Sequence, residues 1–136
     1  MKLLLDSSAW LAYARAEDEP DHEAVAAILT RSARGEVELR LLDLTAYELG
    51  NVVVRAWRQP KRVARLVVDA ALDLCAAPPL VPTASERRDA HALAEEHRLS
   101  VYDGTYAAVA LARRLTLVSG DRQLLSAGLA TAPGDV

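Results

Sequence analysis

The sequence contains a single cysteine, Cys75, and no phenylalanine. One cysteine excludes an internal disulfide and a zinc site built from several thiolates. Cys75 lies in the apolar stretch ALDLCAA, which predicts a small buried side chain rather than a reactive thiol. Because two Trp and four Tyr are the only aromatic residues, the core has to be built mainly from Leu, Val and Ala.

The sequence also lacks a long hydrophobic run. No apolar stretch reaches the ~18 residues that are needed to cross a bilayer. The N-terminus has no charged segment followed by a long apolar segment and a small-residue cleavage site, so no signal peptide is expected. These two absences predict a cytoplasmic protein with no membrane partner.

Several catalytic motifs are missing as well. There is no G-x-S-x-G sequence, which argues against a serine hydrolase with a nucleophile elbow. Nucleotide-binding loops of the G-x-G-x-x-G or G-x-x-x-x-G-K-[ST] type are absent. The histidines His22, His91 and His97 are scattered without the H-E-x-x-H spacing of zinc hydrolases, and surface positions are expected for them.

The chain has no excess of positive charge. Its formal net charge is −3, which does not fit a strongly basic nucleic-acid binder. Four arginines lie within a short stretch of sequence on both sides of Pro60, and Pro60 is expected to break the helix there. These arginines are candidates for contacts with RNA phosphates, and a solvated charged surface is the simpler alternative. They are Arg55, Arg58, Arg62 and Arg65.

Short apolar runs alternate with longer helical patterns along the chain, which predicts an α/β fold with a parallel sheet. Strands are expected at residues 2–5, 37–42, 79–82 and 115–119. Helices are expected at residues 8–16, 20–35, 45–59, 61–77, 84–99, 103–114 and 121–128. No linker, repeat or low-complexity segment interrupts this pattern, so residues 1–136 are expected to form one domain.

Four acidic residues stand where a strand ends or a helix begins: Asp6, Glu48, Asp103 and Asp121. Taken singly, each has a structural explanation. Aspartate is a favoured N-cap residue, and a carboxylate in the first turn of a helix interacts favourably with the helix dipole. Thr45 and Glu48 match the capping-box pattern S/T-x-x-E, so Glu48 has the alternative role of bonding back to the start of its own helix.

Taken together, the four acids point to a shared site. The carboxyl ends of parallel strands lie at one edge of a sheet, where ligands bind, and both Asp6 and Asp121 follow predicted strands. Glu48 and Asp103 begin helices that can reach the same crevice. Four converging carboxylates repel one another unless a cation neutralises them. Oxygen ligands without Cys or nearby His suit Mg²⁺ or Mn²⁺ rather than zinc, and such a site activates water to cleave a phosphodiester.

Four segments of the sequence resemble, in order, the motifs of PIN-domain nucleases. LLLDSSAW is similar to the opening motif, in which hydrophobic residues precede D-[ST]-S. TAYELGNVVVRA is similar to the second motif, and HALAEEHRLSVYDGTYAAVALARR is similar to the third. LTLVSGDRQLL is similar to the fourth, L-V-T-x-D. The length and layout resemble the VapC-type toxins of bacterial toxin–antitoxin pairs, which are essentially a bare PIN domain.

The resemblance implies a PIN-like three-layer sandwich with a short central parallel sheet flanked by helices. It also implies that Asp6, Glu48, Asp103 and Asp121 form the acidic quartet that binds the metal. We expect Asp6 and Asp103 to hold the ion most directly. Glu48 is expected to complete the ligand shell or orient water, and Asp121 to bind through water or a second ion.

Two hydroxyl residues and two glycines accompany this quartet. Ser8 matches the hydroxyl that usually supports the first aspartate, and Ser119 stands where threonine is commoner in the fourth motif. Gly104 replaces the usual alanine after the third acid, and Gly120 directly precedes the fourth. We expect these glycines to leave the carboxylates in place and to loosen that edge of the molecule slightly.

The resemblance further implies RNA as the substrate, a homodimer, and a small antitoxin protein that blocks the site. The aromatic residues Trp10, Tyr13, Tyr47 and Trp57 lie near the apolar helices. Core packing is expected for them, with a groove for a partner as the alternative.

The sequence therefore predicts a Mg²⁺- or Mn²⁺-dependent endoribonuclease that hydrolyses RNA phosphodiester bonds and acts as the toxin of a toxin–antitoxin pair. A PIN-like module that binds RNA or protein without cutting is one alternative, and the presence of all four acids argues against it. An acid-pocket phosphatase is the other. It is disfavoured because Ser8 leaves no second carboxylate two residues after Asp6.

Overall fold

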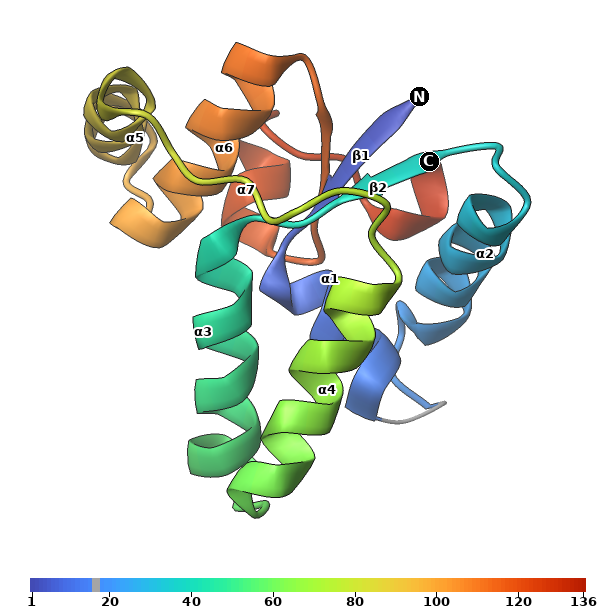
Figure 1. The fold of residues 1–136 in the computed structure, drawn as a ribbon. Coiled ribbons are helices and arrows are strands. Elements are labelled where there is room, and N and C mark those ends of the chain that lie inside the picture. Colours follow the sequence, from blue (N-terminus) through green and yellow to red (C-terminus); the bar gives the residue numbers. More distant parts are fainter. Residues whose placement is uncertain (16–17) are drawn as a thin grey trace.

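The computed structural model describes residues 1–15 and 18–136. Three parallel strands form a small central sheet in the order β2-β1-β3. They are β1 (Lys2–Leu5), β2 (Glu38–Arg40) and β3 (Thr116–Val118). Helices cover both faces of this sheet, which confirms the predicted α/β fold with a short parallel sheet (Figure 1).

The α helices of the described residues are α1 Ser7–Arg15, α2 His22–Ala33, α3 Asp43–Asn51, α4 Lys61–Asp73, α5 Ala84–His97, α6 Val101–Arg113 and α7 Arg122–Ser126. A π-helical turn, η1 (Val52–Ala56), continues α3, and a 3₁₀ turn, η2 (Pro133–Asp135), lies at the C-terminus. The last residue of the helix predicted at 8–16, Ala16, lies outside the described residues. Within the described ranges there is no helix with the length and apolar character that crossing a membrane requires.

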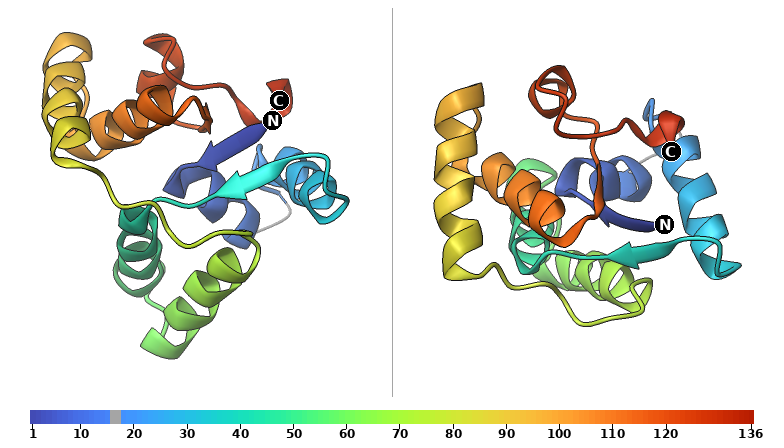
Figure 2. Two further views of the ribbon diagram at one scale, coloured as in Figure 1. Left: turned by 45° about the horizontal axis from the view of Figure 1, so that its top comes forward. Right: turned by 90° about the horizontal axis from the view of Figure 1, so that it is seen from above.

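The central strand β1 divides the core into two halves. Leu3, Leu4 and Leu5 are fully buried, as expected for a central parallel strand that is covered on both faces. Leu3 and Leu5 pack with residues of α1, α2 and α4, including Trp10. Leu4 packs on the opposite face with residues of α5, α6 and α7. The three layers are seen in the two views of Figure 2.

The helix predicted at 45–59 is divided into two segments. It begins at Asp43, changes to π-helical bonding at Val52 and ends near Trp57, whose N–H donates to the Val52 carbonyl oxygen at 3.0 Å. Arg58 then adopts a left-handed backbone with φ of 53°, and the chain reverses into α4 after Pro60. As a result, α3 and α4 run side by side and project from the sheet (Figure 1).

The prediction of a strand at residues 79–82 is wrong. Only Leu80 makes a strand-like contact, an isolated parallel bridge to Leu42. Its N–H donates to the Leu41 carbonyl oxygen at 2.7 Å, and its carbonyl oxygen accepts from the Asp43 N–H at 2.8 Å. Pro79 and Pro82 have no N–H to extend the ladder on either side, so pairing stops at one residue.

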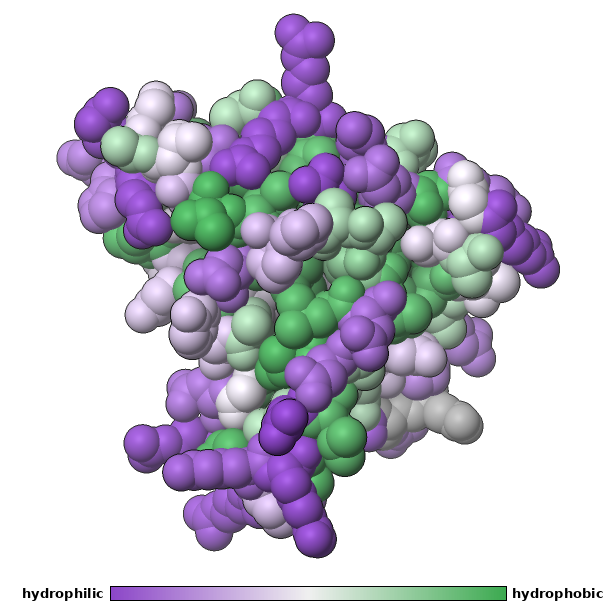
Figure 3. Space-filling model, viewed as in Figure 1, coloured by the Kyte–Doolittle hydropathy of each residue, from purple (hydrophilic) through white to green (hydrophobic). Residues whose placement is uncertain are grey.

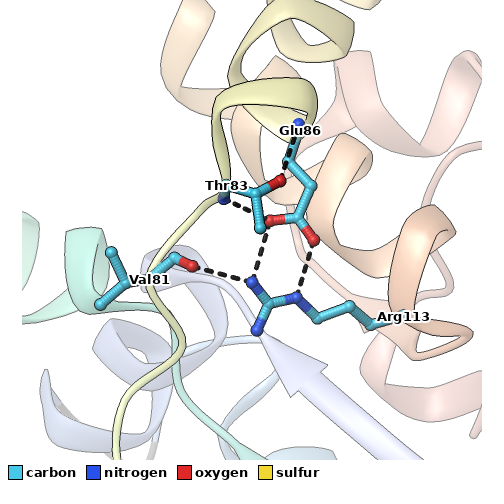
Figure 4. Close-up of polar contacts among 4 residues, drawn as sticks. All are labelled: Val81, Thr83, Glu86 and Arg113. Atoms are coloured by element: carbon cyan, nitrogen blue, oxygen red, sulfur yellow. Dashed lines mark hydrogen bonds and ion pairs between the residues drawn. The ribbon is translucent and has the colours of Figure 1, made fainter.

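A polar cluster fixes the start of α5 to the end of α6 (Figure 4). Thr83 and Glu86 form a capping box, with bonds from Glu86 N to Thr83 Oγ1 and from Thr83 N to Glu86 Oε2. Arg113 donates from Nε and Nη2 to the two Glu86 carboxylate oxygens, at 2.8 and 2.9 Å. It also donates to the Val81 carbonyl oxygen. This ion pair, between buried Glu86 and partly exposed Arg113, explains how a charged residue is accommodated inside the α5–α6 layer.

Gly104 allows α5 and α6 to approach closely. A Cβ at this position would lie 2.3 Å from the Ala90 carbonyl oxygen and 3.2 Å from the Ala94 Cβ. The expectation that Gly104 loosens this edge is therefore wrong, because the missing side chain makes the contact between the two helices tighter.

Candidate functional site

Asp6 lies at the carboxyl edge of the sheet, directly after β1. Its N–H donates to the Val118 carbonyl oxygen at 3.1 Å, so the chain is still held in register with β3 where the carboxylate begins. The residue is only 3% exposed. Its Oδ1 accepts from the Ser8 hydroxyl at 2.6 Å and from the Ala9 N–H at 3.1 Å, and its Oδ2 accepts from the Ser119 hydroxyl.

The turn after β3 orients these two hydroxyls. Gly120 donates its N–H to Ser8 Oγ, and Asp121 donates its N–H to Ser119 Oγ, each at 2.9 Å. Each serine oxygen thus accepts from the backbone and directs its own proton toward Asp6. The two candidate supporting hydroxyls, Ser8 and Ser119, are joined in one hydrogen-bonded network with the first acid and the fourth.

Glu48 is held by Tyr106, a residue that the sequence motifs do not single out. Tyr106, which is 1% exposed, donates its hydroxyl to Glu48 Oε1 at 2.8 Å. The same hydroxyl is bonded to Thr45 Oγ1 at 2.7 Å. The capping box between Thr45 and Glu48 is wrong, because α3 begins two residues before Thr45, at Asp43. Tyr106 lies three residues after Asp103 on α6, a spacing that places both on one helix face.

Asp103 and Asp121 both occupy helix starts. Asp103 is the third residue of α6, two residues after the observed start, and its N–H donates to the N-cap hydroxyl of Ser100 at 3.1 Å. Asp121 is itself the N-cap of α7, and its Oδ1 accepts from the backbone N–H groups of Gln123 and Leu124. Asp121 therefore has the capping role that its position in the sequence suggests. That role does not exclude a second one for the same carboxylate.

Burial and mutual repulsion act on these acids together. Burial raises the pKa of Asp6, and the charge of Asp103 raises it further, against the opposing effect of the Ser119, Ser8 and Ala9 hydrogen bonds. The pKa of Glu48 is raised by burial and by the charges of Asp6 and Asp103. Burial and the charge of Asp121 raise the pKa of Asp103. The charges of Asp6, Glu48 and Asp103 thus act on one another, and the charge of Asp121 acts on Asp103.

The carboxylates are close enough to repel one another, but they are not arranged as a set of metal ligands. Within the two described ranges, no three Asp, Glu, His or Cys side chains are grouped so that they could hold a metal ion as they stand. The Asp6 oxygens are directed at hydroxyl donors, and the Asp121 Oδ1 at helix N–H groups. The chemistry of the donors is nevertheless all oxygen, which suits a hard divalent ion.

The arginine cluster surrounds the end of the α3–α4 pair. Its four side chains are exposed, and the chain reversal at Pro60 distributes them over η1, the turn and the start of α4. Arg65 is paired with Asp69 at 3.6 Å, one turn later on the same helix. Figure 3 shows hydrophilic side chains projecting from this end of the molecule.

Cys75 is partly buried beside the core cluster of the β1 face. Burial raises the pKa of its thiol to about 11, so the thiol stays protonated at neutral pH. This agrees with the predicted role as a small hydrophobic side chain.

Two cavities adjoin the candidate site, and a third lies apart from it. Ser8 and Gly120 line one of about 420 Å³, and Glu48 lines one of about 490 Å³. The third, of about 270 Å³, is an apolar groove between α1, α3 and α4. Hydrophobic residues gather over α4 in Figure 3.

The four aromatic residues expected in the core divide between core and surface. Trp10 is 3% exposed, whereas Tyr13 is 39% and Tyr47 is 69% exposed, and Trp57 is half-buried. Core packing is therefore confirmed for Trp10 and wrong for Tyr47. Trp10 and Tyr13 both line the apolar groove.

A small parallel sheet with acids gathered at the carboxyl ends of its strands defines a PIN-like α/β fold. The family model described as PIN domain matches residues 3–128, and the chain belongs to the PIN domain family. PIN domains are generally nucleases, and these nucleases generally use divalent metal ions. A comparison with curated proteins gave no match.

Two solved structures are similar to this chain. PAE2754 from Pyrobaculum aerophilum is 28% identical, with a TM-score of 0.66 over 93% of this chain and 78% of that chain. FitAcB from Neisseria gonorrhoeae is 23% identical, with a TM-score of 0.70 over 98% of this chain and 99% of that chain. At this identity the likeness to FitAcB shows a shared fold.

Proposed function

We propose that this PIN domain is a Mg²⁺- or Mn²⁺-dependent endoribonuclease whose metal ligands are Asp6, Glu48, Asp103 and Asp121. The observation that supports the proposal is the placement of the acids: Asp6 ends β1 at the carboxyl edge of the sheet, and Asp121 follows β3 in the same hydrogen-bonded network. Burial and the charges of neighbouring acids raise the pKa values of Asp6, Glu48 and Asp103. Ionised carboxylates gathered in this way cost free energy, and a divalent cation offsets that cost.

The donor set fits a hard divalent ion, because every candidate ligand is a carboxylate oxygen and Cys75 lies away from the acids in the core. A divalent ion supplies a nucleophilic water at neutral pH and charge neutralisation at a phosphodiester. The chain's own residues have to position the carboxylates for that chemistry.

Ser8 and Ser119 are proposed to act on Asp6 as positioning residues. Their hydroxyls donate to the two carboxylate oxygens and thereby favour the ionised form, which opposes the effect of burial. Because backbone N–H groups of Gly120 and Asp121 fix the direction of these hydroxyls, the carboxylate is held in one orientation.

Tyr106 is proposed to hold Glu48 in the same way. Its hydroxyl donates to Glu48 Oε1, while burial and the neighbouring Glu48 charge raise the tyrosine pKa well above 10. Tyr106 therefore remains a hydrogen-bond donor at any pH at which RNA is stable.

Asp6→Asn tests the nuclease directly. We expect it to abolish RNA cleavage by purified protein in Mg²⁺, because it removes the most buried charge of the quartet. Asp73→Asn, at an exposed position on α4, is the matched control and should cut at the wild-type rate. Circular dichroism should show both variants folded. Wild-type cleavage that persists in a chelator, or a fully active Asp6→Asn, would contradict the proposal.

A non-catalytic PIN-like module that binds RNA or protein is the second candidate. The observation in its favour is that no three acids of the described residues are grouped as a ready ligand cage. RNA binding without cleavage products, in Mg²⁺ and in Mn²⁺, would favour this candidate over the nuclease.

We further propose that the protein is a homodimeric toxin whose partner is a small antitoxin. The support is the resemblance of the four motifs to VapC-type toxins and the apolar groove lined by Trp10, Tyr13, Leu66 and Leu74. Leu66 is 67% exposed, which is unfavourable for a surface that stays uncovered. A short reading frame for a small DNA-binding protein directly upstream would support this pairing. Growth arrest on expression, relieved by that small protein, is the test.

A further inference from the structure

A cavity of mixed polarity, about 420 Å³ in volume, lies beside the hydrogen-bonded network around Asp6. Ser8 and Gly120, which belong to the network around Asp6, form one part of its wall. Trp57, Arg15 and Asp21 line other parts of it. Its volume lies within the range of about 300–1,000 Å³ that is usual for small-ligand sites. The proposed mechanism assigns no role to this cavity.

Asp21 supplies hydrogen-bond acceptors to the cavity. It is the N-cap residue of α2, where an aspartate ordinarily accepts from the first N–H groups of the helix, but its side chain makes no cap hydrogen bond. The carboxylate instead lies against the turn after β3. A Cβ on Gly120 would be 2.7 Å from Asp21 Oδ2 and 3.7 Å from Ser8 Oγ. The absence of a side chain at Gly120 makes room for this carboxylate beside the site.

Trp57 supplies an aromatic surface. Its indole is half-buried at the end of the π-helical turn, and the Arg15 guanidinium carbon lies over the ring, 5.9 Å from the centroid. Aromatic side chains that adjoin a nucleic-acid backbone commonly stack on unpaired bases, which are read along their Watson–Crick edges. Val52 lines both this cavity and the one that contains Glu48, so the two adjoin.

We propose that this cavity binds the guanine base of the nucleotide next to the bond that is cut, with Trp57 as the stacking surface and Asp21 as the residue that selects guanine. This inference rests on the proposed ribonuclease function and names the nucleotide that its site takes. A carboxylate presents two acceptor oxygens and no donor. Guanine offers two adjacent donors on its Watson–Crick edge, N1–H and the N2 amino group. Adenine, cytosine and uracil each place an acceptor beside their donor, which the second carboxylate oxygen would repel.

The first test measures nucleotide binding without cleavage. Trp57 is the half-buried tryptophan, whereas Trp10 is 3% exposed, so quenching by nucleotides reports on Trp57. The wild-type protein is titrated with GMP, IMP, AMP, CMP and UMP. We expect GMP to bind about tenfold or more tightly than AMP, CMP or UMP, the usual effect of a hydrogen bond to a charged group. IMP lacks the N2 amino group and should fall between GMP and AMP.

Three variants separate the roles of the residues. Asp21→Asn should bind all five nucleotides within about twofold of one another, since it replaces one acceptor by a donor. Gly120→Ala should have the same effect, because its Cβ displaces the Asp21 carboxylate. Trp57→Phe should lose the fluorescence response, as only the buried Trp10 remains. Asp89→Asn, at an exposed position on α5, is the matched acid control and should keep the GMP preference.

Two outcomes overturn the inference. One is that the quenching titrations give equal affinities of the wild type for AMP and GMP, and the other is a GMP preference that survives Asp21→Asn. Cleavage of RNA oligonucleotides with inosine in place of guanosine at each position is measured in parallel. Specific GMP binding without RNA cleavage would support the base site and refute the proposed nuclease. Metal-dependent cleavage without any nucleotide preference would support the nuclease and refute the base site.

Discussion

Glu86 shows how a single buried charge is made favourable in this molecule. It is 6% exposed, accepts two hydrogen bonds from Arg113, and closes a capping box with Thr83. The Arg113 guanidinium holds the pKa of Glu86 below its ordinary value of 4.5. The carboxylate therefore contributes stability above pH 4.5, and this contribution is lost as the pH falls through the lowered pKa.

Glu86→Gln should lower the free energy of unfolding at pH 7 by about 1–3 kcal/mol, because a charged hydrogen-bond acceptor for Arg113 is lost. The difference from wild type should shrink as the pH is lowered below 4.5, where the wild-type carboxylate becomes protonated. Urea denaturation at several pH values measures this. Glu95→Gln, exposed on the same helix, is the control and should have little effect at any pH. A Glu86→Gln penalty that does not change with pH would contradict the account.

At the scale of single residues, the sequence predicts the position of a residue when neighbouring residues determine it. It does not predict hydrogen bonds between residues that are far apart in the chain. Asp6 ends an apolar strand abruptly, so its place at the sheet edge could be predicted. The partner of Glu48 could not, because Tyr106 is 58 residues away and reads as an ordinary core aromatic. For the same reason the capping box of Thr45 and Glu48 is an open alternative in the sequence, whereas the Thr45 hydroxyl is bonded to Tyr106 in the structure.

At the scale of secondary-structure elements, α5 and α6 approach each other closely at Gly104. Gly104 of α6 lies against the Ala90 carbonyl oxygen of α5. Asp103 is the residue before Gly104 in the same helix. The α6 start also brings Tyr106 to Glu48 of α3. The position of two acids thus depends on how tightly these two helices pack.

Gly104→Ala should destabilise the protein by about 1–3 kcal/mol or more, since the added Cβ meets backbone that cannot move aside. Gly50→Ala is the matched control. A Cβ at Gly50 would meet nothing within 4 Å, so the substitution should stabilise α3 by about 0.5–1 kcal/mol. Thermal unfolding of the two variants measures both effects. Equal stability of Gly104→Ala and wild type would show that the helices can separate without cost.

Element boundaries were predictable where the chain carries its own signal. Pro60 was expected to break the helical pattern, and the break is there. The π-helical turn at Val52–Ala56 was not foreseen, because nothing in VVVRA distinguishes it from an ordinary helix. The segment at 79–82 has the apolar composition of a strand, yet its prolines limit pairing to Leu80.

At the scale of the whole molecule, charge is separated into regions. The net charge is −3, yet the end of the α3–α4 pair carries a group of exposed arginines, and the acids gather at the sheet edge. Under the proposed function, the arginines would hold the RNA on which the acids act, and phosphate contacts of this kind depend strongly on salt. The net charge of −3 therefore does not argue against the proposed RNA substrate.

The double variant Arg58→Gln, Arg62→Gln should weaken binding of single-stranded RNA for all sequences alike. Two lost phosphate contacts should reduce the slope of log affinity against log salt by about 1.4. Fluorescence anisotropy in the Asp6→Asn background measures this without cleavage. Arg87→Gln, Arg88→Gln on α5 is the control and should leave the slope unchanged. The same slope in both double variants would show that RNA does not contact the end of the α3–α4 pair.

The central claim is that the coupled acids hold a divalent cation, and Asp103 provides its sharpest test. Burial and the Asp121 charge raise the pKa of Asp103 from 3.8. The folded protein therefore binds more protons than the unfolded chain just above that pH, and the ionised form costs stability at neutral pH. Asp103→Asn removes this cost, and it also removes a proposed ligand of the cation.

The measurement is the melting temperature of wild type and Asp103→Asn at pH 7, in EDTA and in excess Mg²⁺. An ion present at about 100 times its Kd stabilises the folded state by about 2.7 kcal/mol. We predict that Asp103→Asn has a higher melting temperature than wild type in EDTA. Mg²⁺ should raise the melting temperature of wild type far more than that of the variant, so that wild type is the more stable protein in Mg²⁺. The account is contradicted if Mg²⁺ shifts neither protein, or shifts both equally.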